Sequence, residues 1–216
     1  MSNGREKQLA AEAAAELVED GMRVGLGTGS TVAFLLPALA RRGLALRCVA
    51  TSLATETAAR ELGLSVEPFS GVDGLAELDI AIDGADQVAP SGWLVKGGGA
   101  AHTREKAVAA AARRFVVIVS SDKLVERLGP PIPLELLDYG IAATLRRLGS
   151  VGLRDVPRSP DGGLIADYTG AFDDPAALAS RLSETTGVVE HGLFGPALVS
   201  DLVVGRGDDV EYRRLR

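Results

Sequence analysis

Short, mostly apolar runs alternate with helical patterns along the first 120 residues, and this alternation constrains the fold more than any other feature. The runs occupy residues 22–25, 46–50, 78–82 and 115–119. The helical patterns occupy residues 9–20, 31–42, 55–62 and 103–114. Nearly continuous apolar strands joined by helices are typical of a mostly parallel sheet that is covered on both faces. The sequence therefore predicts an α/β fold with a Rossmann-like sheet.

A different order of elements follows the proline-rich stretch 129–133. The pattern there predicts strand, helix, strand, strand, helix and strand, the order of a smaller ferredoxin-like α+β domain. The apolar run 202–204 is expected to return to the first sheet. We therefore expect an α/β domain of residues 1–128 and 197–216 and a small ferredoxin-like domain of residues 129–196.

Composition excludes several functional classes. Lys and Arg number 23 and Asp and Glu 29, for a net charge of −6, which argues against a nucleic-acid binder or a polybasic membrane anchor. A local pocket for a small anion stays possible. Cys48 is the single cysteine, so no intrachain disulfide can form, and with only two histidines the composition argues against a Cys/His zinc site. The longest apolar run, 32–40, falls well short of the about 20 residues of a membrane span, and the N-terminal residues form no apolar signal segment. We expect a cytoplasmic protein that binds neither membrane nor nucleic acid.

Glycine clusters mark the expected ligand edge of the sheet. Three motifs each follow a predicted strand: GLGTGST at 25–31, DGAD at 83–86 and KGGGAAHTREK at 96–106. The carboxyl ends of parallel strands are where ligands bind in such folds. Glycine costs backbone entropy, so its clustering there indicates close approach of the backbone to a ligand.

The first motif has the chemistry of an anion cradle, formed by Thr28, Gly29, Ser30 and Thr31. Backbone N–H groups at a helix start, together with three hydroxyls, suit a phosphate. Ser30 stands where the dinucleotide fingerprint requires its third glycine, and the next strand is not followed by a ribose-binding acid. A single phosphate is therefore favoured over NAD or a nucleoside triphosphate. The alternative is a tight turn in which Ser30 caps the helix.

The second motif, Asp83, Gly84, Ala85 and Asp86, presents two carboxylates at the same edge. They could orient or deprotonate a ligand, or Asp83 could simply cap backbone N–H groups in a turn. The pair could also hold a divalent metal. No histidine or third acid lies nearby in sequence, so we expect no metal site.

The third motif is the most specific of the three. A triple glycine, Gly97, Gly98 and Gly99, is expensive to order and has no packing value, so its expected use is close contact with a ligand. Lys96 supplies a positive charge beside it. Glu105 falls in the first turn of the next helix, near its positive end. The alternative is a solvated lysine and an ordinary helix-start glutamate.

In this order and spacing, the three motifs and the segment GVVEHGLF at 187–194 resemble the type A ribose-5-phosphate isomerase family over essentially the whole chain. The resemblance implies a homo-oligomer, a dimer or a tetramer, that needs no cofactor and no metal. It also implies interconversion of D-ribose 5-phosphate and D-ribulose 5-phosphate, a step of the non-oxidative pentose phosphate pathway.

The resemblance also implies roles for single residues. Glu105 is expected to be the proton-transferring base, and the three motifs are expected to contact the substrate. Lys123, which could otherwise be an exposed lysine, matches a second phosphate contact, and Lys7 matches an N-terminal lysine near the phosphate. Gln87 and Ser120 depart from the family, which commonly has acids at both positions. These departures bear on recognition of the sugar hydroxyls.

The chemistry of such an isomerase assigns the remaining groups. The cradle and Lys123 are expected to hold the phosphate. Lys96 and the N–H groups of 97–99 are expected to stabilise the negative charge of a cis-enediolate. Asp83 is our candidate for the acid/base of ring opening, and Asp86 for the orientation of hydroxyls.

Two other functions fit parts of this pattern. A sugar-phosphate sensor would need the cradle but neither Lys96 nor Glu105. An isomerase of a different sugar phosphate could use the same groups, because a fold does not fix the substrate.

Overall fold

The computed structural model describes residues 3–216, which group into two compact units. The larger unit comprises Met1–Ala85, from residue 3 onward, with Arg104–Leu124 and Ala197–Arg216. The smaller unit comprises Asp86–Thr103 and Val125–Pro196. Segment 86–103 thus groups with the smaller unit, although the expected α/β domain includes it. The expected domain boundaries themselves stay a prediction.

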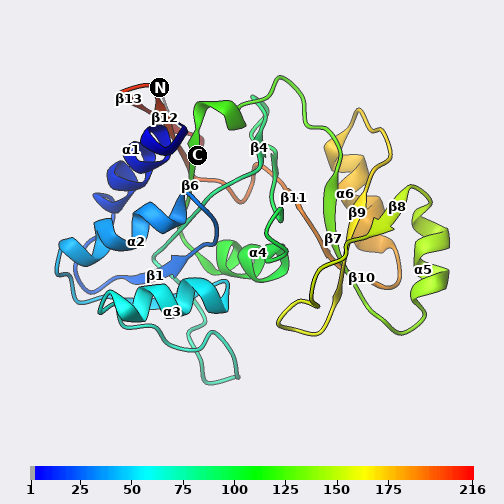
Figure 1. Cartoon of the computed structure of the whole chain (residues 1–216), viewed down its shortest axis with the longest axis horizontal. Helices are drawn as coiled ribbons and strands as arrows, with labels where there is room; N and C mark the ends of the chain where they lie inside the picture. The colour runs from blue at the N-terminus through cyan, green and yellow to red at the C-terminus, as the bar shows by residue number, and fades with distance from the viewer. Residues whose placement is uncertain (1–2) are drawn as a thin grey trace. The chain divides into compact units, whose positions relative to one another are not determined.

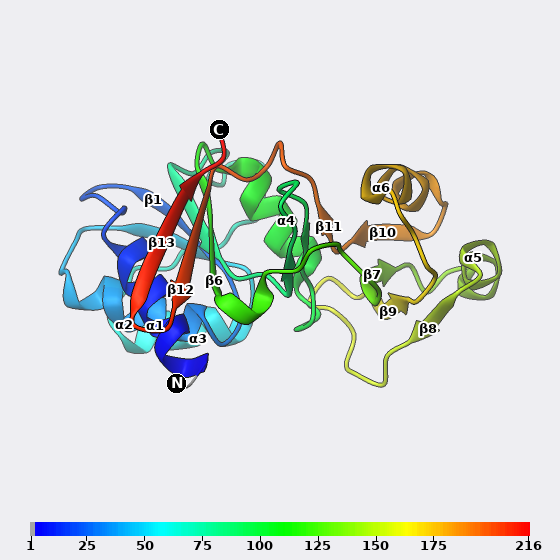
Figure 2. The same ribbon diagram turned by 90° about the horizontal axis from the view of Figure 1, so that it is seen from above.

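A six-stranded sheet forms the centre of the larger unit, in the order β13-β12-β6-β3-β1-β2. Its strands are β1 (Arg23–Leu26), β2 (Arg47–Ala50), β3 (Ile80–Asp83), β6 (Phe115–Ser120), β12 (Asp201–Arg206) and β13 (Asp209–Arg214). All neighbouring strands are parallel except β12 and β13, which form an antiparallel hairpin at one edge (Figures 1 and 2). The expected α/β class with a mostly parallel sheet is confirmed.

Helices pack on both faces of this sheet. They are α1 (Asn3–Ala15), α2 (Val32–Arg41), α3 (Leu53–Glu61) and α4 (His102–Ala111). On one face, α1 and α2 pack on each other and share a core with strand residues such as Val24 and Leu26 (Figure 1). Gly25 faces the other side, because strand residues alternate. A side chain there would lie 2.4 Å from Cγ1 of Val108, so glycine lets α4 approach the sheet closely.

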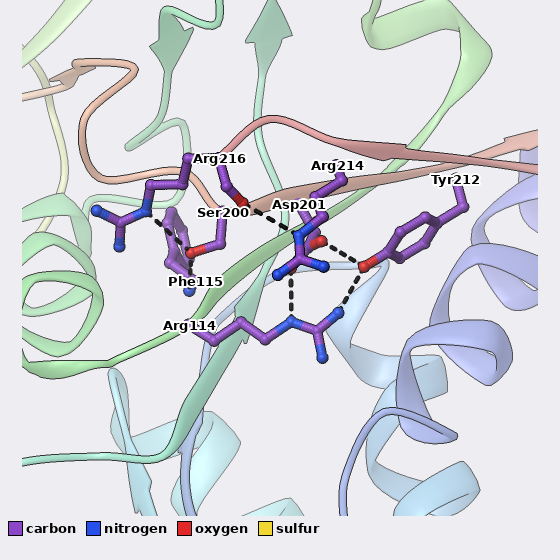
Figure 3. Close-up of polar contacts among 7 residues, drawn as sticks. All are labelled: Arg114, Phe115, Ser200, Asp201, Tyr212, Arg214 and Arg216. Carbon is purple, nitrogen blue, oxygen red and sulfur yellow. Dashed lines mark hydrogen bonds and ion pairs between the residues drawn. The ribbon is translucent and has the colours of Figure 1, made fainter.

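A polar cluster fastens β13 to the sheet at the amino ends of its neighbours. The buried carboxylate of Asp201 accepts hydrogen bonds from Arg114 Nε at 2.6 Å and from the Tyr212 hydroxyl (Figure 3). The same hydroxyl accepts a bond from the Arg114 guanidinium. Burial and the hydrogen bond to Asp201 raise the pKa of Tyr212, so the phenol stays a neutral donor. These contacts hold an edge strand that contributes little to the core.

The smaller unit contains the expected ferredoxin-like order of elements. They are β7 (Ile132–Leu136), α5 (Ile141–Leu148), β8 (Val151–Leu153), β9 (Leu164–Tyr168), α6 (Pro175–Glu184) and β10 (Val188–His191). The strands form an antiparallel sheet in the order β10-β7-β9-β8. Asp174 caps α6 by accepting bonds from two backbone N–H groups, and Pro175 occupies the first helical position, where its missing N–H is harmless.

A second, three-stranded sheet of the smaller unit carries the glycine motif. Its strands are β4 (Gln87–Val88), β5 (Leu94–Val95) and β11 (Leu193–Phe194), in the antiparallel order β11-β5-β4. The chain leaves β5 directly into Lys96 and the three glycines. This sheet therefore sets the direction in which the third motif begins.

Candidate functional site

The cradle after β1 is held by two threonine hydroxyls, one directly after β2 and one on α3. The Thr28 hydroxyl lies 2.7 Å from that of Thr51 and 3.2 Å from that of Thr55. Thr55 in turn donates to the Gly27 carbonyl at 2.9 Å. Gly29 has φ +116°, a conformation that a side chain would strain. The turn is thus held by two threonines from outside it and shaped by a glycine that cannot be replaced freely.

Ser30 contacts a lysine rather than capping a helix. Its hydroxyl accepts a hydrogen bond of 2.9 Å from Nζ of Lys7 on α1. Thr31 occupies the cap position of α2 and forms no side-chain cap bond. The alternative in which Ser30 is the N-cap is therefore wrong. A cation and a hydroxyl meet at the cradle, as an anion site requires.

Asp83 ends β3 beneath the cradle, and only 3% of it is exposed. Its Oδ1 accepts from the N–H groups of Thr28 at 3.0 Å and Gly84 at 2.7 Å. Gly27 makes room for it, since a Cβ there would lie 2.0 Å from the carboxyl carbon. The capping role considered from sequence is thus real, but it uses Oδ1. The carboxylate is locked against the cradle backbone.

Glu105 is a buried carboxylate in the first turn of α4, with 5% of the residue exposed. A glutamate that merely favoured the helix start would be solvated, so that alternative is wrong. The residue lies near the positive end of the helix dipole. A buried carboxylate at the start of a helix is typical of a functional position.

A second lysine lies on a short 3-10 helix, η1 (Ser121–Lys123), after β6. The Lys123 side chain is 34% exposed and its Nζ lies 3.7 Å from Asp122. Sequence reasoning missed Glu6, which ties this helix to α1. Its carboxylate accepts from the backbone N–H and hydroxyl of Ser121 at 2.8 and 2.7 Å. Glu6 directly precedes Lys7 in α1, so the α1 start, which bonds to Ser30, and η1 lie against each other.

Gly207 completes this tie. Its N–H donates to the second carboxylate oxygen of Glu6 at 2.8 Å, and this bond, with those from Ser121, lowers the pKa of Glu6. Glu6 therefore stays ionised in the neutral range.

The two residues at which the chain departs from the family pattern, Ser120 and Gln87, also have hydrogen-bond partners. Ser120 donates to Asp122, and the Gln87 amide exchanges two bonds of 2.9 Å with the Gly129 backbone.

The third motif begins with a buried lysine in the smaller unit. Lys96 is 2% exposed, and its Nζ lies 5.6 Å from the centre of the Phe194 ring. Its backbone N–H donates to the Gly192 carbonyl at 2.8 Å, which continues the β5–β11 pairing. A solvated surface lysine, the alternative considered from sequence, is therefore wrong.

The triple glycine is bound on two sides within the same unit. Asp86 accepts a bond of 2.8 Å from the Gly98 N–H. A guanidinium nitrogen of Arg154 donates to the carbonyls of Gly97 and Gly98 at 3.0 and 3.1 Å. Gly97 has φ +103°, and a Cβ there would meet the His102 ring at 2.7 Å. Sequence reasoning missed Arg154, because no local signal links positions 57 residues apart.

The division into units runs through the predicted motifs. The chain passes from one unit to the other between Ala85 and Asp86 and again between Thr103 and Arg104. Asp83 and Glu105 thus belong to the larger unit, with the cradle, Lys7 and Lys123. Asp86, Lys96 and the glycines belong to the smaller unit.

Three further features of the described residues concern metal ligands, membrane spans and the cysteine. Residues 3–216 contain no group of three or more His, Cys, Asp and Glu side chains placed to hold a metal ion. No helix among them has the length and apolar character needed to cross a membrane. Cys48 is fully buried in the core, and burial raises its pKa to about 12, so its thiol is no nucleophile at neutral pH.

Comparison with known proteins decides the family. The sequence pattern of ribose 5-phosphate isomerase A (phosphoriboisomerase A) matches residues 47–209. The chain belongs to this family. Ribose-5-phosphate isomerase A of Caulobacter vibrioides is 45% identical over 226 residues, 97% of this chain and 98% of the relative. The family resemblance seen in the motifs is confirmed.

Solved structures of the family share the fold. The ribose 5-phosphate isomerase A of Neisseria gonorrhoeae is 31% identical, with a TM-score of 0.92 over 100% of this chain and 98% of that one. A D-ribose-5-phosphate isomerase in complex with phospho-erythronic acid is 32% identical, with a TM-score of 0.90 over 99% of this chain and 100% of that one. The family thus covers the whole length of the chain.

Proposed function

We propose that this protein interconverts D-ribose 5-phosphate and D-ribulose 5-phosphate through a cis-enediolate, without a metal. The observation that carries the proposal is the buried carboxylate of Glu105 at the start of α4, in a chain of this family. One relative was solved with phospho-erythronic acid, a phosphorylated sugar acid whose carboxylate resembles an enediolate. That ligand supports the same substrate class here.

The phosphate is proposed to bind at the α2 end of the larger unit. The cradle 28–31 is proposed to bind it through the backbone N–H groups of 29–31 and the hydroxyls of Ser30 and Thr31, and the helix dipole favours an anion. Lys7 is already held at this point by Ser30, and Lys123 lies on the short helix that Glu6 fastens to α1. The chain has a net charge of −6 and repels a phosphate dianion, so binding it needs a local pair of cations such as these lysines.

The proton transfer between the two carbons is proposed to use Glu105 alone. Its carboxylate removes the proton from C2 of the open-chain aldose, and the C–H electron pair forms the C1–C2 double bond while the aldehyde oxygen becomes negative. The proton of the C2 hydroxyl must also move to the negative C1 oxygen, a transfer for which Asp83 is the proposed acid/base. Glu105 then returns its proton to C1, and the electrons on the C2 oxygen re-form a carbonyl. A general base of this kind typically contributes about 10²–10⁴-fold.

The negative oxygen of the intermediate is proposed to be stabilised by Lys96 and the glycine loop 97–99, in which the Gly98 N–H already donates to Asp86. Lys96 is buried, so its charge acts in a medium of low polarity where it is most effective. Asp83 is proposed to open the sugar ring and Asp86 to orient hydroxyls. Their carboxylates are fixed by the N–H groups of Thr28 and Gly98, respectively.

A sensor that only binds sugar phosphates is the competing function. Such a protein would need the anion cradle but neither Lys96 nor Glu105, and both of these charged residues are buried here. We further propose that the enzyme acts in the cytoplasm as a homo-oligomer, a dimer or a tetramer, as its resemblance to the family implies.

The test is turnover by EDTA-treated protein. Ketose formation is followed with D-ribose 5-phosphate, D-arabinose 5-phosphate and D-glucose 6-phosphate as separate substrates. The proposal predicts rapid, metal-independent turnover of the first. Sugar-phosphate binding detected by calorimetry without ketose formation would indicate a sensor. Faster turnover of another sugar phosphate would indicate a different isomerase.

A further inference from the structure

Arg154 follows β8 and is held rigidly by its neighbour on β9. Its Nε and Nη2 donate to the two carboxylate oxygens of Asp167 at 2.7 and 2.6 Å, a bidentate pair. Only 17% of the Arg154 side chain is exposed. Its backbone N–H also donates to the Ile165 carbonyl at 2.9 Å. A planar guanidinium fixed in this way presents its remaining nitrogen in a defined direction.

That remaining nitrogen holds the triple glycine. Nη1 of Arg154 donates to the carbonyls of Gly97 and Gly98, at 3.0 and 3.1 Å. The peptide between these two glycines is also held by its N–H, which donates to Asp86 at 2.8 Å. Asp86 adds an attractive charge that helps to raise the pKa of Arg154 beyond the main effect of Asp167.

Because peptides are planar, this contact also fixes the direction of the neighbouring N–H group. The carbonyl and the N–H of a trans peptide point in opposite directions. When the Gly98 carbonyl is turned towards Arg154, the Gly99 N–H of the same peptide must point away from it. Three successive glycines have no side chains that could impose this arrangement, and they have more conformations to lose than any other residues. The order must come from outside the loop.

We propose that Arg154 is a positioning residue, which fixes the peptides of the glycine loop so that the Gly99 N–H meets the developing negative charge of the enediolate. This inference rests on the proposed isomerase function. Arg154 does not touch the reacting atoms itself. A fixed donor array stabilises a transition state because it needs no rearrangement during the reaction, and Arg154 with Asp167 supplies that rigidity here.

The test compares Arg154→Ala with Arg158→Ala, using D-ribose 5-phosphate as substrate. Arg158 is a matched control, because it also pairs with an aspartate, Asp138, and bonds a glycine carbonyl, that of Gly162, but lies on the surface of the same unit. For Arg154→Ala we expect kcat to fall about 10- to 100-fold, the range of a reacting group misplaced by about 1 Å. KM should stay within about threefold, because the proposed phosphate contacts do not involve this loop.

Chemical rescue separates positioning from general damage. Guanidinium chloride at low millimolar concentration should restore part of the kcat of Arg154→Ala, whereas potassium chloride at equal ionic strength should not. Arg154→Lys should be intermediate, since an ammonium lacks the planar fork. A kcat of Arg154→Ala within twofold of wild type overturns the inference. So does an equal loss in Arg158→Ala, or a loss that guanidinium does not reverse in a folded variant. A wild-type protein without turnover would instead overturn the proposed function itself.

Discussion

Gly27→Ala tests whether Asp83 must lie against the cradle. The added methyl carbon would sit 2.0 Å from Cγ and Oδ1 of Asp83, where carbon atoms normally keep about 3.5–4.0 Å apart. The carboxylate must therefore retreat by about 1 Å or more and release the N–H groups of Thr28 and Gly84. Gly27 does not have a positive φ, so this contact is the main source of strain.

The size of the effect follows from the hydrogen bonds that the displaced Asp83 carboxylate loses. A hydrogen bond to a charged group is worth about 1.5–3 kcal/mol, so losing both, with partial relaxation, lowers the free energy of unfolding by about 3 kcal/mol. For a chain of this size that corresponds to a Tm about 6–12 °C lower. A catalytic group misplaced by about 1 Å can lower kcat about 10²-fold. Thermal unfolding and ketose formation measure the two effects.

A double-mutant cycle makes the reasoning refutable. Asp83→Gly removes every Asp83 atom that the new methyl would meet, so Gly27→Ala should add little further loss in that background. Gly152→Ala is the matched control, since a Cβ there meets nothing within 4 Å, and it should be nearly neutral. If Gly27→Ala keeps kcat within threefold of wild type, or if its effect multiplies fully with that of Asp83→Gly, the proposed coupling is wrong.

Three further predictions concern the phosphate, the oxyanion and acid stability. Ser30→Ala removes the partner of Lys7 and should raise KM and the inhibition constant of inorganic phosphate several-fold, with kcat within about twofold; an unchanged KM would contradict the cradle. Lys96→Met should lower kcat about 10²–10³-fold in steady-state assays, and a normal kcat would remove it from the oxyanion site. Arg23 holds the pKa of Asp79 at about 2, below its usual 3.8, so this pair stabilises the fold above pH 4 and the contribution is lost as pH falls towards 2. Asp79→Asn should flatten the fall of Tm in that window, and an unaltered curve would refute the assignment.

The order of strands and helices was predictable because burial on both faces requires apolar runs. β6 is a clear example, with all of its residues buried. β13 was not predicted, because an edge strand that is exposed along one side shows no apolar run, and its sequence DVEYRR is mostly charged. Its place depends on the remote contact of Tyr212 with Asp201, which local sequence does not reveal.

Tertiary contacts also move helix ends. The alanine-rich pattern predicts a helix over 9–20, but α1 spans Asn3–Ala15. Arg42, from the end of α2, donates to the carbonyls of Ala15 and Val18 and so satisfies the helix end early. Propensity alone cannot place that end, because the group that satisfies it comes from another element.

The candidate site also has a part that the sequence could predict and a part that it could not. Its motifs could be found in the sequence, because glycine clusters and charged residues at strand ends have local chemical reasons. The residues that hold those motifs could not. Thr51, Glu6 and Arg154 act through bonds to residues 23, 115 and 57 positions away, respectively. Such partners are ordinary polar residues until the fold brings them together.

The central claim is that the Glu105 carboxylate moves the proton between C2 and C1. The direct test follows D-ribose 5-phosphate in deuterated water by NMR, with EDTA-treated wild type and Glu105→Gln. The account predicts partial deuterium at C1 of the wild-type ketose, because the proton on Glu105 can exchange with solvent before it returns. It also predicts turnover about 10²–10⁴-fold slower for Glu105→Gln with sugar-phosphate binding largely intact. Near-normal turnover by Glu105→Gln would contradict it.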